Sequence, residues 1–376
     1  MGSNRLFLLF QYKKMEITVD LTSIYGRRLT GIELFALDLY NTLVCEFKNY
    51  KVKKIVKYKN TVDDVESNTI ILKTKSRLIV EQLLIPIAIN KISSKLVIFP
   101  AFPPGLLTYS LKRKSTKVAV VIHDTVMWKY HHTLSFKAKL YLKPLFDLAI
   151  KKADFILAVS KSVKEELESL FKIDNIYYIG SKISEIYKKE NVSKTSTDIL
   201  LRLNLTKDKY LLSVSTLEPR KNLKYLLKVY EELVRLGMDK KLVLVGRKGW
   251  DKEILSIFHR YDLENRILYA GYLSEADLIT LYKNCYAFIL LSLYEGFGRT
   301  PLEALACGAR IIVSDIPVFR ENLDGHAIFV PLGNSEEAAR IIYTEISNLD
   351  SNDIDIYSKL SKSFKENLSY FLINVL

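Results

Sequence analysis

Two carboxylates lie eight positions apart around a glycine-rich turn in the segment Glu295-Gly296-Phe297-Gly298-Arg299-Thr300-Pro301-Leu302-Glu303. The apolar run 287–291 before it is typical of a strand buried on both faces, and Pro301 suits the first turn of a helix. Backbone N–H groups at such a helix start, together with the positive end of the helix dipole, favour an anion such as phosphate. Since carboxylates repel phosphate, we expect Glu295 and Glu303 to bind the hydroxyl groups of the same ligand. The segment therefore predicts a sugar-nucleotide site.

A basic pair, Arg220 and Lys221, follows a predicted strand at 210–214 and directly precedes a predicted helix at 223–236. Ligands of parallel sheets bind at the carboxyl edge, where these two residues fall. A guanidinium and an ammonium there can neutralise a diphosphate leaving group. Such a pair alone is more often solvated surface, but next to a phosphate cradle at 296–298 it favours diphosphate binding.

His123 and Asp124 end another predicted strand, 118–122, again at the carboxyl edge. We expect His123 to face the ligand and to bond a sugar hydroxyl. The alternative is that Asp124 caps a turn and His123 only packs beside it. Gly31 follows the first predicted strand, 15–20, where a glycine lets the backbone approach a ligand closely, although a plain helix-start turn explains it equally well.

The three cysteines, Cys45, Cys285 and Cys307, show no CxxC spacing, which argues against a disulfide framework or a zinc site and for a reducing compartment. We expect Cys307 to be a buried core residue, because free cysteines usually are. Asp353-Ile354-Asp355 has the DxD form that some sugar transferases use to hold a cation. It follows no buried strand, so we expect no metal site.

Predicted strands alternate with predicted helices along the chain, which indicates an α/β protein with parallel sheets. The pattern runs through residues 15–190, is interrupted by a polar linker at 191–208, and restarts over 209–355; residues 1–14 are an extension. Two such halves of a 376-residue chain leave a cleft between them, a favoured ligand position. The remaining predicted strands are 96–99, 155–159, 176–179, 242–245, 267–269 and 310–313, and the remaining helices are 31–47, 140–152, 161–171, 275–284, one from 301, and 336–349.

The net charge of +14 is concentrated in the N-terminal half. Residues 1–195 hold 33 Lys and Arg against 18 Asp and Glu, whereas the remainder is close to neutral. A solvated basic surface, an anionic membrane surface and a nucleic-acid surface all fit this excess, which includes the lysine-rich stretches 51–59 and 112–117. No nucleic-acid-binding module is recognisable, so we expect no nucleic-acid partner. No stretch reaches the roughly 20 apolar residues of a membrane span, and 6–10 is too short for a signal peptide, so we expect a cytoplasmic protein.

An ordered set of motifs resembles the retaining family-4 glycosyltransferases of the GT-B fold, over roughly residues 15–376. Within that family the chain looks most like the bacterial mannosyl- and rhamnosyl-transferase-like branch of surface-polysaccharide assembly. The motifs are Thr30-Gly31-Ile32, Glu81-Gln82, His123-Asp124, Ala153-Asp154 with Val159-Ser160, Glu218-Pro219-Arg220-Lys221-Asn222, Leu244-Val245-Gly246, Ala270-Gly271-Tyr272 and Tyr294-Glu295-Gly296-Phe297-Gly298 with Glu303.

The resemblance implies two Rossmann-like domains facing each other across a cleft, with a last helix at 356–376 that crosses back to the first domain. It implies that Glu295 holds donor-sugar hydroxyls, that Arg220 and Lys221 hold the diphosphate, and that His123 lies beside the donor sugar. Glu303 is implied to bind the ribose. The implied donor-binding residues together are Gly31, Gly271, Tyr272, Leu273, Gly296, Phe297, Gly298, Arg299, Thr300 and Glu303.

The implied activity is retaining transfer of a hexose without a metal or other cofactor. The donor is a nucleotide sugar, with GDP-mannose favoured and a UDP- or dTDP-sugar possible. The acceptor is a lipid-linked oligosaccharide of O-antigen, capsule or another surface polysaccharide. The basic first half would face that acceptor and an anionic membrane, which places the enzyme peripherally on the inner face of the cytoplasmic membrane.

Two alternatives stay open. One is a GT-B protein without transferase activity that binds a sugar nucleotide or serves as a partner subunit, and the other is a GT-B nucleotide-sugar epimerase. The chain also departs from the family at three positions. Glu33 stands where a second glycine is common, Arg299 replaces an apolar residue and is expected to reach the donor phosphates or Glu295, and Ser215 replaces a frequent glycine.

Overall fold

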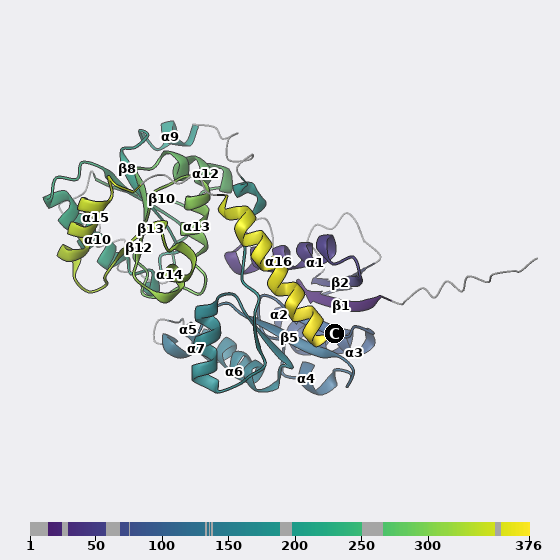
Figure 1. The fold of residues 1–376 in the computed structure, drawn as a ribbon. Coiled ribbons are helices and arrows are strands. Elements are labelled where there is room, and N and C mark those ends of the chain that lie inside the picture. Colours follow the sequence, from purple (N-terminus) through teal and green to yellow (C-terminus); the bar gives the residue numbers. More distant parts are fainter. Residues whose placement is uncertain are drawn as a thin grey trace, which may run out of the picture. The chain divides into compact units, whose positions relative to one another are not determined.

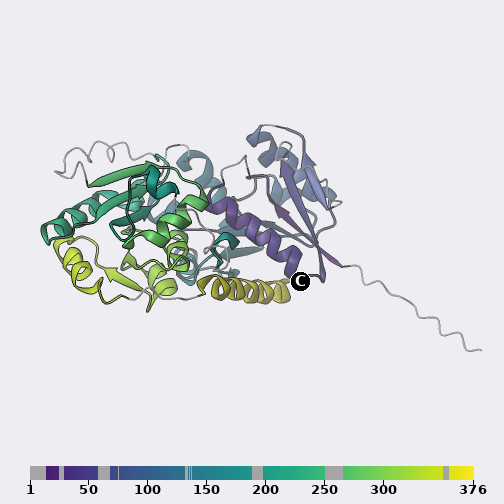
Figure 2. The same cartoon turned by 90° about the horizontal axis from the view of Figure 1, so that it is seen from above.

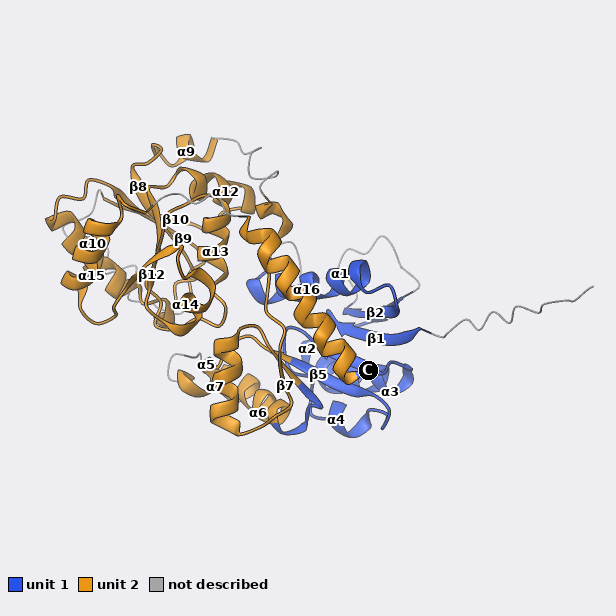
Figure 3. Ribbon diagram, viewed as in Figure 1, with its two compact units in different colours: residues 1–120, 151–155, 376 blue, residues 121–150, 156–375 orange. Residues whose placement is uncertain are grey.

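The structure is a computed structural model that describes residues 14–24, 29–57, 68–74, 76–131, 134, 136, 138–188, 198–249, 266–349 and 355–376. The chain divides into two compact units (Figure 3). Unit 1 comprises residues 1–120, 151–155 and 376, and unit 2 comprises residues 121–150 and 156–375.

The strands form two parallel sheets, as the alternating pattern of the sequence predicts (Figure 1). The seven-stranded sheet has the order β3-β2-β1-β4-β5-β6-β7, and the six-stranded sheet has the order β10-β9-β8-β11-β12-β13. The first sheet contains β1 Met15–Asp20, β2 Tyr50–Lys57, β3 Thr69–Leu72, β4 Leu96–Phe99, β5 Lys117–Ile122, β6 Phe155–Ala158 and β7 Ile176–Tyr178. The second contains β8 Tyr210–Val214, β9 Lys241–Val245, β10 Ile267–Gly271, β11 Ala287–Leu290, β12 Ile311–Ser314 and β13 Ala327–Val330.

The helices fall between the strands, which is the connection that parallel strands require. In the first 200 residues they are α1 Gly31–Glu46, α2 Arg77–Ile79, η1 Val80–Leu84, α3 Ile85–Lys91, α4 Thr108–Leu111, α5 Val126–Lys129, η3 Ala138–Leu142, α6 Lys143–Lys152, α7 Lys161–Phe171 and η4 Glu185–Tyr187. Further along they are α9 Asp198–Arg202, η5 Pro219–Lys221, α10 Leu223–Arg235, α12 Glu275–Asn284, α13 Arg299–Ala306, α14 Pro317–Leu323, α15 Ser335–Glu345 and α16 Ile356–Val375.

The central strands are buried on both faces, so their sequences read as continuous apolar runs. All four residues of β11 are buried, as are all four of β12 and five of the six in β5. Strands covered by helices on both sides need no polar face. The run at 287–291 is therefore a core strand, as predicted, and it ends directly before the glycine-rich turn.

Residues 51–57 of the lysine-rich stretch 51–59 belong to strand β2, a strand that we did not predict. Val52, Ile55 and Val56 are buried between its lysines, and β2 pairs in parallel with both β1 and β3. Lysine covers apolar surface with its aliphatic stem, so a strand can carry lysines and still pack. The charge concealed the strand in the sequence.

Short polar side chains fix where several helices begin. Ser160 Oγ accepts from Val163 N at 3.0 Å at the start of α7, and Ser274 Oγ accepts from Asp277 N at 3.2 Å at the start of α12. At α1, Glu33 Oε2 accepts from Thr30 N at 2.7 Å. Such bonds satisfy backbone N–H groups that a helix start leaves without a partner. The unusual Glu33 is thus a helix-capping residue.

In unit 2, α10 and α15 pack together over one face of the second sheet (Figure 1). The core beneath them includes Leu227 and Tyr230 of α10, Ile342 of α15 and Ile289 of β11. The long helix α16, yellow in Figure 2, contacts α13 and places Phe371 5.2 Å from the ring of Tyr177 in β7. The contact with α16 helps to hold α13, the helix that begins directly after the glycine-rich turn.

Candidate active site

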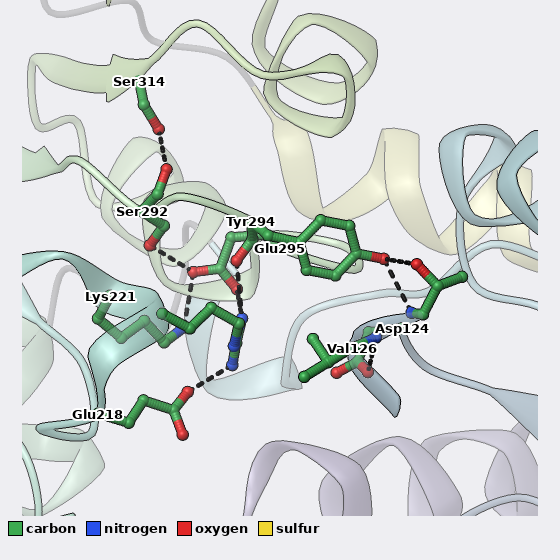
Figure 4. Close-up of polar contacts among 10 residues, drawn as sticks. Asp124, Val126, Glu218, Lys221, Ser292, Tyr294, Glu295 and Ser314 are labelled. Carbon is green, nitrogen blue, oxygen red and sulfur yellow. Dashed lines mark hydrogen bonds and ion pairs between the residues drawn. The ribbon is translucent and has the colours of Figure 1, made fainter. Parts of the chain in front are cut away.

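A cluster of opposite charges lies at the carboxyl ends of β8 and β11, which are neighbours in the second sheet. Lys221 Nζ donates to Glu295 Oε1 at 2.6 Å, and Arg220 Nη1 donates to Glu295 Oε2 at 3.0 Å. Arg220 Nη2 also donates to Glu218 Oε1 at 2.6 Å (Figure 4). The two motifs, 75 residues apart in sequence for Arg220 and Glu295, therefore form one site.

The backbone around Glu295 is held as firmly as its carboxylate. Arg220 Nη1 donates to the carbonyl oxygen of Tyr294 at 2.9 Å, and Leu293 N donates to the carbonyl oxygen of Arg220 at 2.9 Å. Ser292 Oγ donates to Glu295 Oε1 at 2.8 Å, and Ser314 Oγ of β12 donates to the carbonyl oxygen of Ser292 at 2.6 Å (Figure 4). This chain of bonds orients the carboxylate from both neighbouring strands.

Electrostatics keep the cluster charged although it is buried. Burial of Glu295, which is 8% exposed, would raise its pKa, but Lys221 and Arg220 outweigh burial and lower the pKa of Glu295 to about 2. Burial lowers the pKa of Lys221, and the positive charge of Arg220 adds to that effect. The pKa of Arg220 lies above its usual value, because the neighbouring carboxylates Glu295 and Glu218 outweigh its burial. An ionised carboxylate thus bridges two cations.

The glycine-rich turn lies against the loop that follows β5. A Cβ added to Gly296 would lie 1.8 Å from the carbonyl oxygen of His123, which leaves no space for a side chain. Gly298 has a φ of +81°, a conformation that glycine adopts without strain, and it directly precedes α13. A Cβ there would meet the Phe319 ring at 2.7 Å. The two glycines are therefore required by close packing and by backbone conformation.

Tyr294 connects the turn to the loop after β5 through its hydroxyl group. Its Oη accepts from Thr125 N at 2.9 Å, lies 3.0 Å from Thr125 Oγ1, and donates to Glu166 Oε2 of α7 at 2.9 Å. Asp124 Oδ1 accepts from Val126 N at 3.1 Å, so the capping role considered for Asp124 is present. Burial raises the pKa of Asp124, partly offset by the charge of Arg220. His123 and Asp124 thus lie beside the charged cluster.

The second carboxylate of the motif, Glu303, lies in a separate buried group. Its ion pair is with Arg299, whose Nε is 3.7 Å from Glu303 Oε1, and Tyr282 Oη lies 3.5 Å from Oε2. Burial, reinforced by the nearby Glu275, raises the pKa of Glu303 to about 7, although Arg299 acts in the opposite direction. Arg299, expected to reach the donor phosphates or Glu295, pairs with Glu303 one helical turn away.

The other predicted donor-binding residues lie in α13, in the turn before it, after β10 and at the start of α1. Thr300 is partly buried in the first turn of α13, and Phe297, which is buried, accepts a bond at its carbonyl oxygen from Asn322 Nδ2 at 2.8 Å. Tyr272 is exposed at the end of β10, with the Arg247 guanidinium 4.8 Å from its ring. Gly271, with a φ of +69°, and Leu273 flank it. Gly31 begins α1 in unit 1.

Several residues of the site were given no role from the sequence, although Glu218 and Tyr294 belong to the motifs quoted there. Glu218, Ser292, Tyr294, Thr125 and Glu166 all bond to the predicted residues or to one another. Glu218 and Ser292 lie two and three positions from predicted site residues, so their proximity in sequence was an available indication. Glu166 lies within α7, and only the three-dimensional structure shows its contact with Tyr294.

Cys307 and part of the DxD segment lie among the described residues. Cys307 is buried, and burial raises the pKa of its thiol, as expected for a core residue. Asp353 and Ile354 of the DxD segment lie outside the described residues, and Asp355 Oδ1 accepts from Ser358 N at 3.0 Å at the start of α16. Within the described ranges, His, Cys, Asp and Glu side chains form no group of three or more suited to a metal ion.

Part of the chain is similar to known glycosyltransferases. Residues 201–360 match the profile of the family described as "Glycosyl transferases group 1". The chain is 29% identical over 226 residues to the O-antigen chain mannosyltransferase RfbU of Salmonella typhimurium, covering 59% of this chain and 58% of that protein. It is also 29% identical over 216 residues to the N-acetylgalactosamine-N,N'-diacetylbacillosaminyl-diphospho-undecaprenol 4-alpha-N-acetylgalactosaminyltransferase of Campylobacter jejuni, covering 56% of this chain and 55% of that protein. The matches thus span little more than half the length of these relatives.

The fold is also found among solved structures. Anabaena Alr3699/HepE in complex with UDP and glucose superposes with a TM-score of 0.69 at 16% identity, covering 96% of this chain and all of that one. At this identity the likeness concerns the fold. None of the helices that the structure describes combines the length and apolar character needed to span a bilayer.

Proposed function

We propose that this chain, which belongs to the GT-B-fold glycosyltransferases of the family-4 type, transfers a hexose from a nucleotide sugar to a lipid-linked oligosaccharide in bacterial surface-polysaccharide assembly. The observation that carries the proposal is the Arg220–Glu295–Lys221 cluster beside the start of α13. It joins two fixed cations, a buried ionised carboxylate and a helix N-terminus, which are the groups that a diphosphate and a sugar require.

The two cations would hold the diphosphate of the donor. Among the described residues, Lys221 Nζ has one acceptor, Glu295, so two of its three hydrogens remain for ligand oxygens. Arg220 donates to Tyr294, Glu295 and Glu218, which leaves two of its five N–H groups. A phosphate can thus bind without breaking the ion pairs with Glu295, so the cations stay in position during catalysis.

Glu295 would serve both the cations and the sugar. An ionised carboxylate offers about four acceptor positions. Lys221 and Ser292 occupy two on Oε1, and Arg220 occupies one on Oε2. The remaining position on Oε2 can accept one hydroxyl of the donor hexose. Because Glu295 is held by three donors, it would fix that hydroxyl relative to the diphosphate, which orients the anomeric carbon.

The other site residues complete the donor site. Glu303 would bind the ribose, and the backbone N–H groups of Gly296, Phe297 and Gly298 would support the donor. His123 would lie beside the hexose, since its backbone touches Gly296. The turn of Gly271, Tyr272 and Leu273 would border the base.

In the reaction, the bond between the anomeric carbon and the diphosphate oxygen breaks, and the diphosphate leaves with the electron pair. The acceptor hydroxyl attacks from the same face, and its proton passes to the leaving phosphate oxygen, so the configuration is retained without a covalent intermediate. Negative charge grows on the diphosphate, where Arg220, Lys221 and the α13 dipole stabilise it. Fixed cations and dipoles of this kind stabilise a transition state without reorganisation, so we propose that no metal is needed.

The name of the Salmonella relative, a mannosyltransferase, supports a mannosyl donor here. We therefore favour GDP-mannose over UDP- and dTDP-sugars. The name of the Campylobacter relative contains a diphospho-undecaprenol acceptor, which supports a lipid-linked acceptor here. Such an acceptor would bring the enzyme to the inner face of the cytoplasmic membrane, where the basic N-terminal half would meet anionic lipid.

Thermal unfolding with GDP, UDP, dTDP and their sugars tests donor binding. A ligand that binds only the native state adds roughly 2.7 kcal/mol to the free energy of unfolding at 100 times its Kd, and the melting temperature rises as a result. We expect GDP and GDP-mannose to give the largest shift. Product analysis with and without an acceptor glycan then separates a transferase from an epimerase, which converts the donor without acceptor, and from a non-catalytic protein, which leaves it unchanged.

A further inference from the structure

Seven large apolar side chains are exposed on one small part of unit 1. They belong to the run of α2, η1 and α3, and to α4 and the two residues before it, and each is between 41% and 58% exposed. We call this set the apolar patch: Leu78, Ile79, Leu83, Ile87, Leu106, Leu107 and Leu111. Single exposed leucines are ordinary, whereas a group of this size marks an interaction surface.

The two halves of the patch lie side by side. α3 contacts α4, and Leu106 N donates to the side chain of Gln82 in η1 at 3.1 Å. Gly105 packs so closely on η1 that an added Cβ would lie 2.3 Å from the Glu81 carbonyl oxygen. At the other end, Arg113 Nε donates to the carbonyl oxygen of Asn90 in α3 at 2.7 Å. The exposed side chains of both halves therefore belong to one surface.

Their spacing agrees with one face on each helix. Ile79, Leu83 and Ile87 follow one another at intervals of four, and Leu107 and Leu111 are also four apart. Residues at this interval lie on the same side of a helix. The buried residues of the same helices, Val80, Ile85 and Ile89, face the core instead. The patch is thus a second apolar face that the described residues of the fold do not cover.

The segment that carries the patch has an excess of basic residues, although Lys112 is paired with Asp154, at 3.1 Å between Nζ and Oδ2. Residues 76–115 contain six Lys and Arg and a single acidic residue, Glu81. Glu81 is neutralised by Arg77, at 2.5 Å between Nε and Oε1. Lys91, Arg113 and Lys114 are exposed, and Arg113 donates to the uncharged backbone carbonyl oxygens of Asn90 and Lys91. The rim of the apolar patch therefore carries net positive charge.

An apolar centre with a cationic rim fits an anionic lipid bilayer. Apolar side chains enter the boundary between headgroups and acyl chains, while lysine and arginine bind lipid phosphates. Each Lys or Arg near such a surface adds about 1 kcal/mol to the free energy of membrane binding, which raises the partition coefficient roughly fivefold. Nucleic acid would match the cations and leave the leucines in water, so a bilayer matches both features.

We propose that the apolar patch inserts into the headgroup layer of an anionic membrane, with Lys91, Arg113 and Lys114 at the lipid phosphates. The proposal rests on the proposed function, because membrane binding would bring the enzyme to a lipid-linked acceptor in that layer. It adds that the attachment depends on apolar insertion by named helices and that charge alone is insufficient.

The test measures cosedimentation of the full chain with vesicles of phosphatidylcholine, with and without phosphatidylglycerol, at low and high salt. The patch variant carries Leu83→Ser and Ile87→Ser, and the rim variant carries Lys91→Glu and Lys114→Glu. The matched control carries Leu201→Ser and Leu236→Ser, which are exposed leucines of unit 2. Thermal unfolding verifies that each variant is folded.

The wild type and the control should bind vesicles containing phosphatidylglycerol equally. The patch variant should lose at least about tenfold in partition at both salt concentrations, because burial of each leucine-sized side chain is lost. The rim variant should lose binding mainly at low salt. Equal binding by the patch variant and the wild type, or a wild type that does not distinguish the two lipid compositions, would overturn the proposal. Patch-dependent self-association without vesicle binding would also overturn it.

A second readout separates this proposal from the proposed function. With a water-soluble acceptor analogue in place of the lipid-linked one, the patch variant should transfer hexose at the wild-type rate. Vesicle binding through the patch without any transfer would contradict only the proposed function. Transfer to a lipid-linked acceptor in vesicles at equal rates by the wild type and the patch variant would contradict only the membrane surface.

Discussion

Gly296 lies so close to the carbonyl oxygen of His123 that a Cβ at residue 296 would be 1.8 Å from that oxygen. This contact ties the turn after β11 to the loop after β5. Because Glu295 is the preceding residue, any movement of Gly296 displaces the carboxylate that bridges Arg220 and Lys221. The glycine therefore holds the relative positions of His123 and Glu295.

Gly296→Ala should lower kcat/KM by at least about tenfold, since a misplacement of 1 Å can cost about 100-fold in rate. The backbone must move apart to accept the methyl group, and Glu295 moves with it. Steady-state transfer kinetics measure the effect. Gly325→Ala serves as the control, because Gly325 has a φ of +75° and open space around its Cβ position. Its cost should be conformational, about 1 kcal/mol of stability, with kcat/KM unchanged. Equal kinetics for the two variants would refute the role of the contact.

Tyr294→Phe should remove the hydroxyl that accepts from Thr125 N and donates to Glu166. The lost bonds should cost about 1–3 kcal/mol of unfolding free energy, because buried partners are left unsatisfied. We also expect a lower kcat with little change in nucleotide affinity, since the backbone carbonyl of Tyr294 still binds Arg220.

Tyr225→Phe is the matched control for that substitution. Tyr225 Oη donates to the carbonyl oxygens of Pro331 and Asn334, at 2.8 and 2.9 Å, away from the charged cluster. It should lose stability and keep its kcat. If both variants lost kcat in proportion to stability, Tyr294 would have only a structural role.

The raised pKa of Glu303, about 7, predicts a pH-dependent stability. The folded state holds the proton more tightly than the unfolded state, where a glutamate has a pKa near 4.5. The stabilisation is therefore fully present below about pH 4.5 and is lost as the pH rises through about 7. By linkage it amounts to about 3 kcal/mol between these limits.

Urea unfolding at pH 5 and pH 8 tests this expectation. Between pH 5 and pH 8 the free energy of unfolding of Glu303→Gln, which cannot ionise, should fall by about 2.5 kcal/mol less than that of the wild type. Glu231→Gln on the surface of α10 should follow the wild type. Parallel behaviour of Glu303→Gln and the wild type would show that Glu303 is ionised over the whole range.

The sequence was sufficient to predict that Arg220, Lys221 and Glu295 lie near one another. β8 and β11 were recognisable as apolar runs, and Arg220 and Glu295 lie in the loops that follow these two strands. Because parallel strands end at one edge of the sheet, these residues were expected near each other. Their pairing depends on β8 and β11 being adjacent, which follows from the strand order and not from either motif.

Other features could not be predicted because they depend on contacts between distant segments. Glu166 lies in a helix with no motif, and its bond to Tyr294 spans 128 positions. β2 was not predicted because four of its eight residues are lysines, one of which, Lys57, is buried. In contrast, the contacts of Glu33 and Arg299, which we did not predict, agree with sequence spacing. Glu33 lies three positions after Thr30, and Arg299 lies one helical turn before Glu303.

The central claim is that Glu295 organises the donor for transfer, and substitution of this residue tests it most directly. The assay measures transfer of labelled hexose from the nucleotide sugar to a lipid-linked acceptor by the wild type, Glu295→Ala and Glu295→Gln. Glu321→Gln is the control, because that carboxylate accepts from Lys161 N and Ser162 N at the start of α7, outside the cluster. We predict that both Glu295 variants lose at least about 100-fold in kcat while they remain folded, and that the control stays near the wild-type rate. Transfer by the folded Glu295 variants within a few-fold of the wild type would contradict the account.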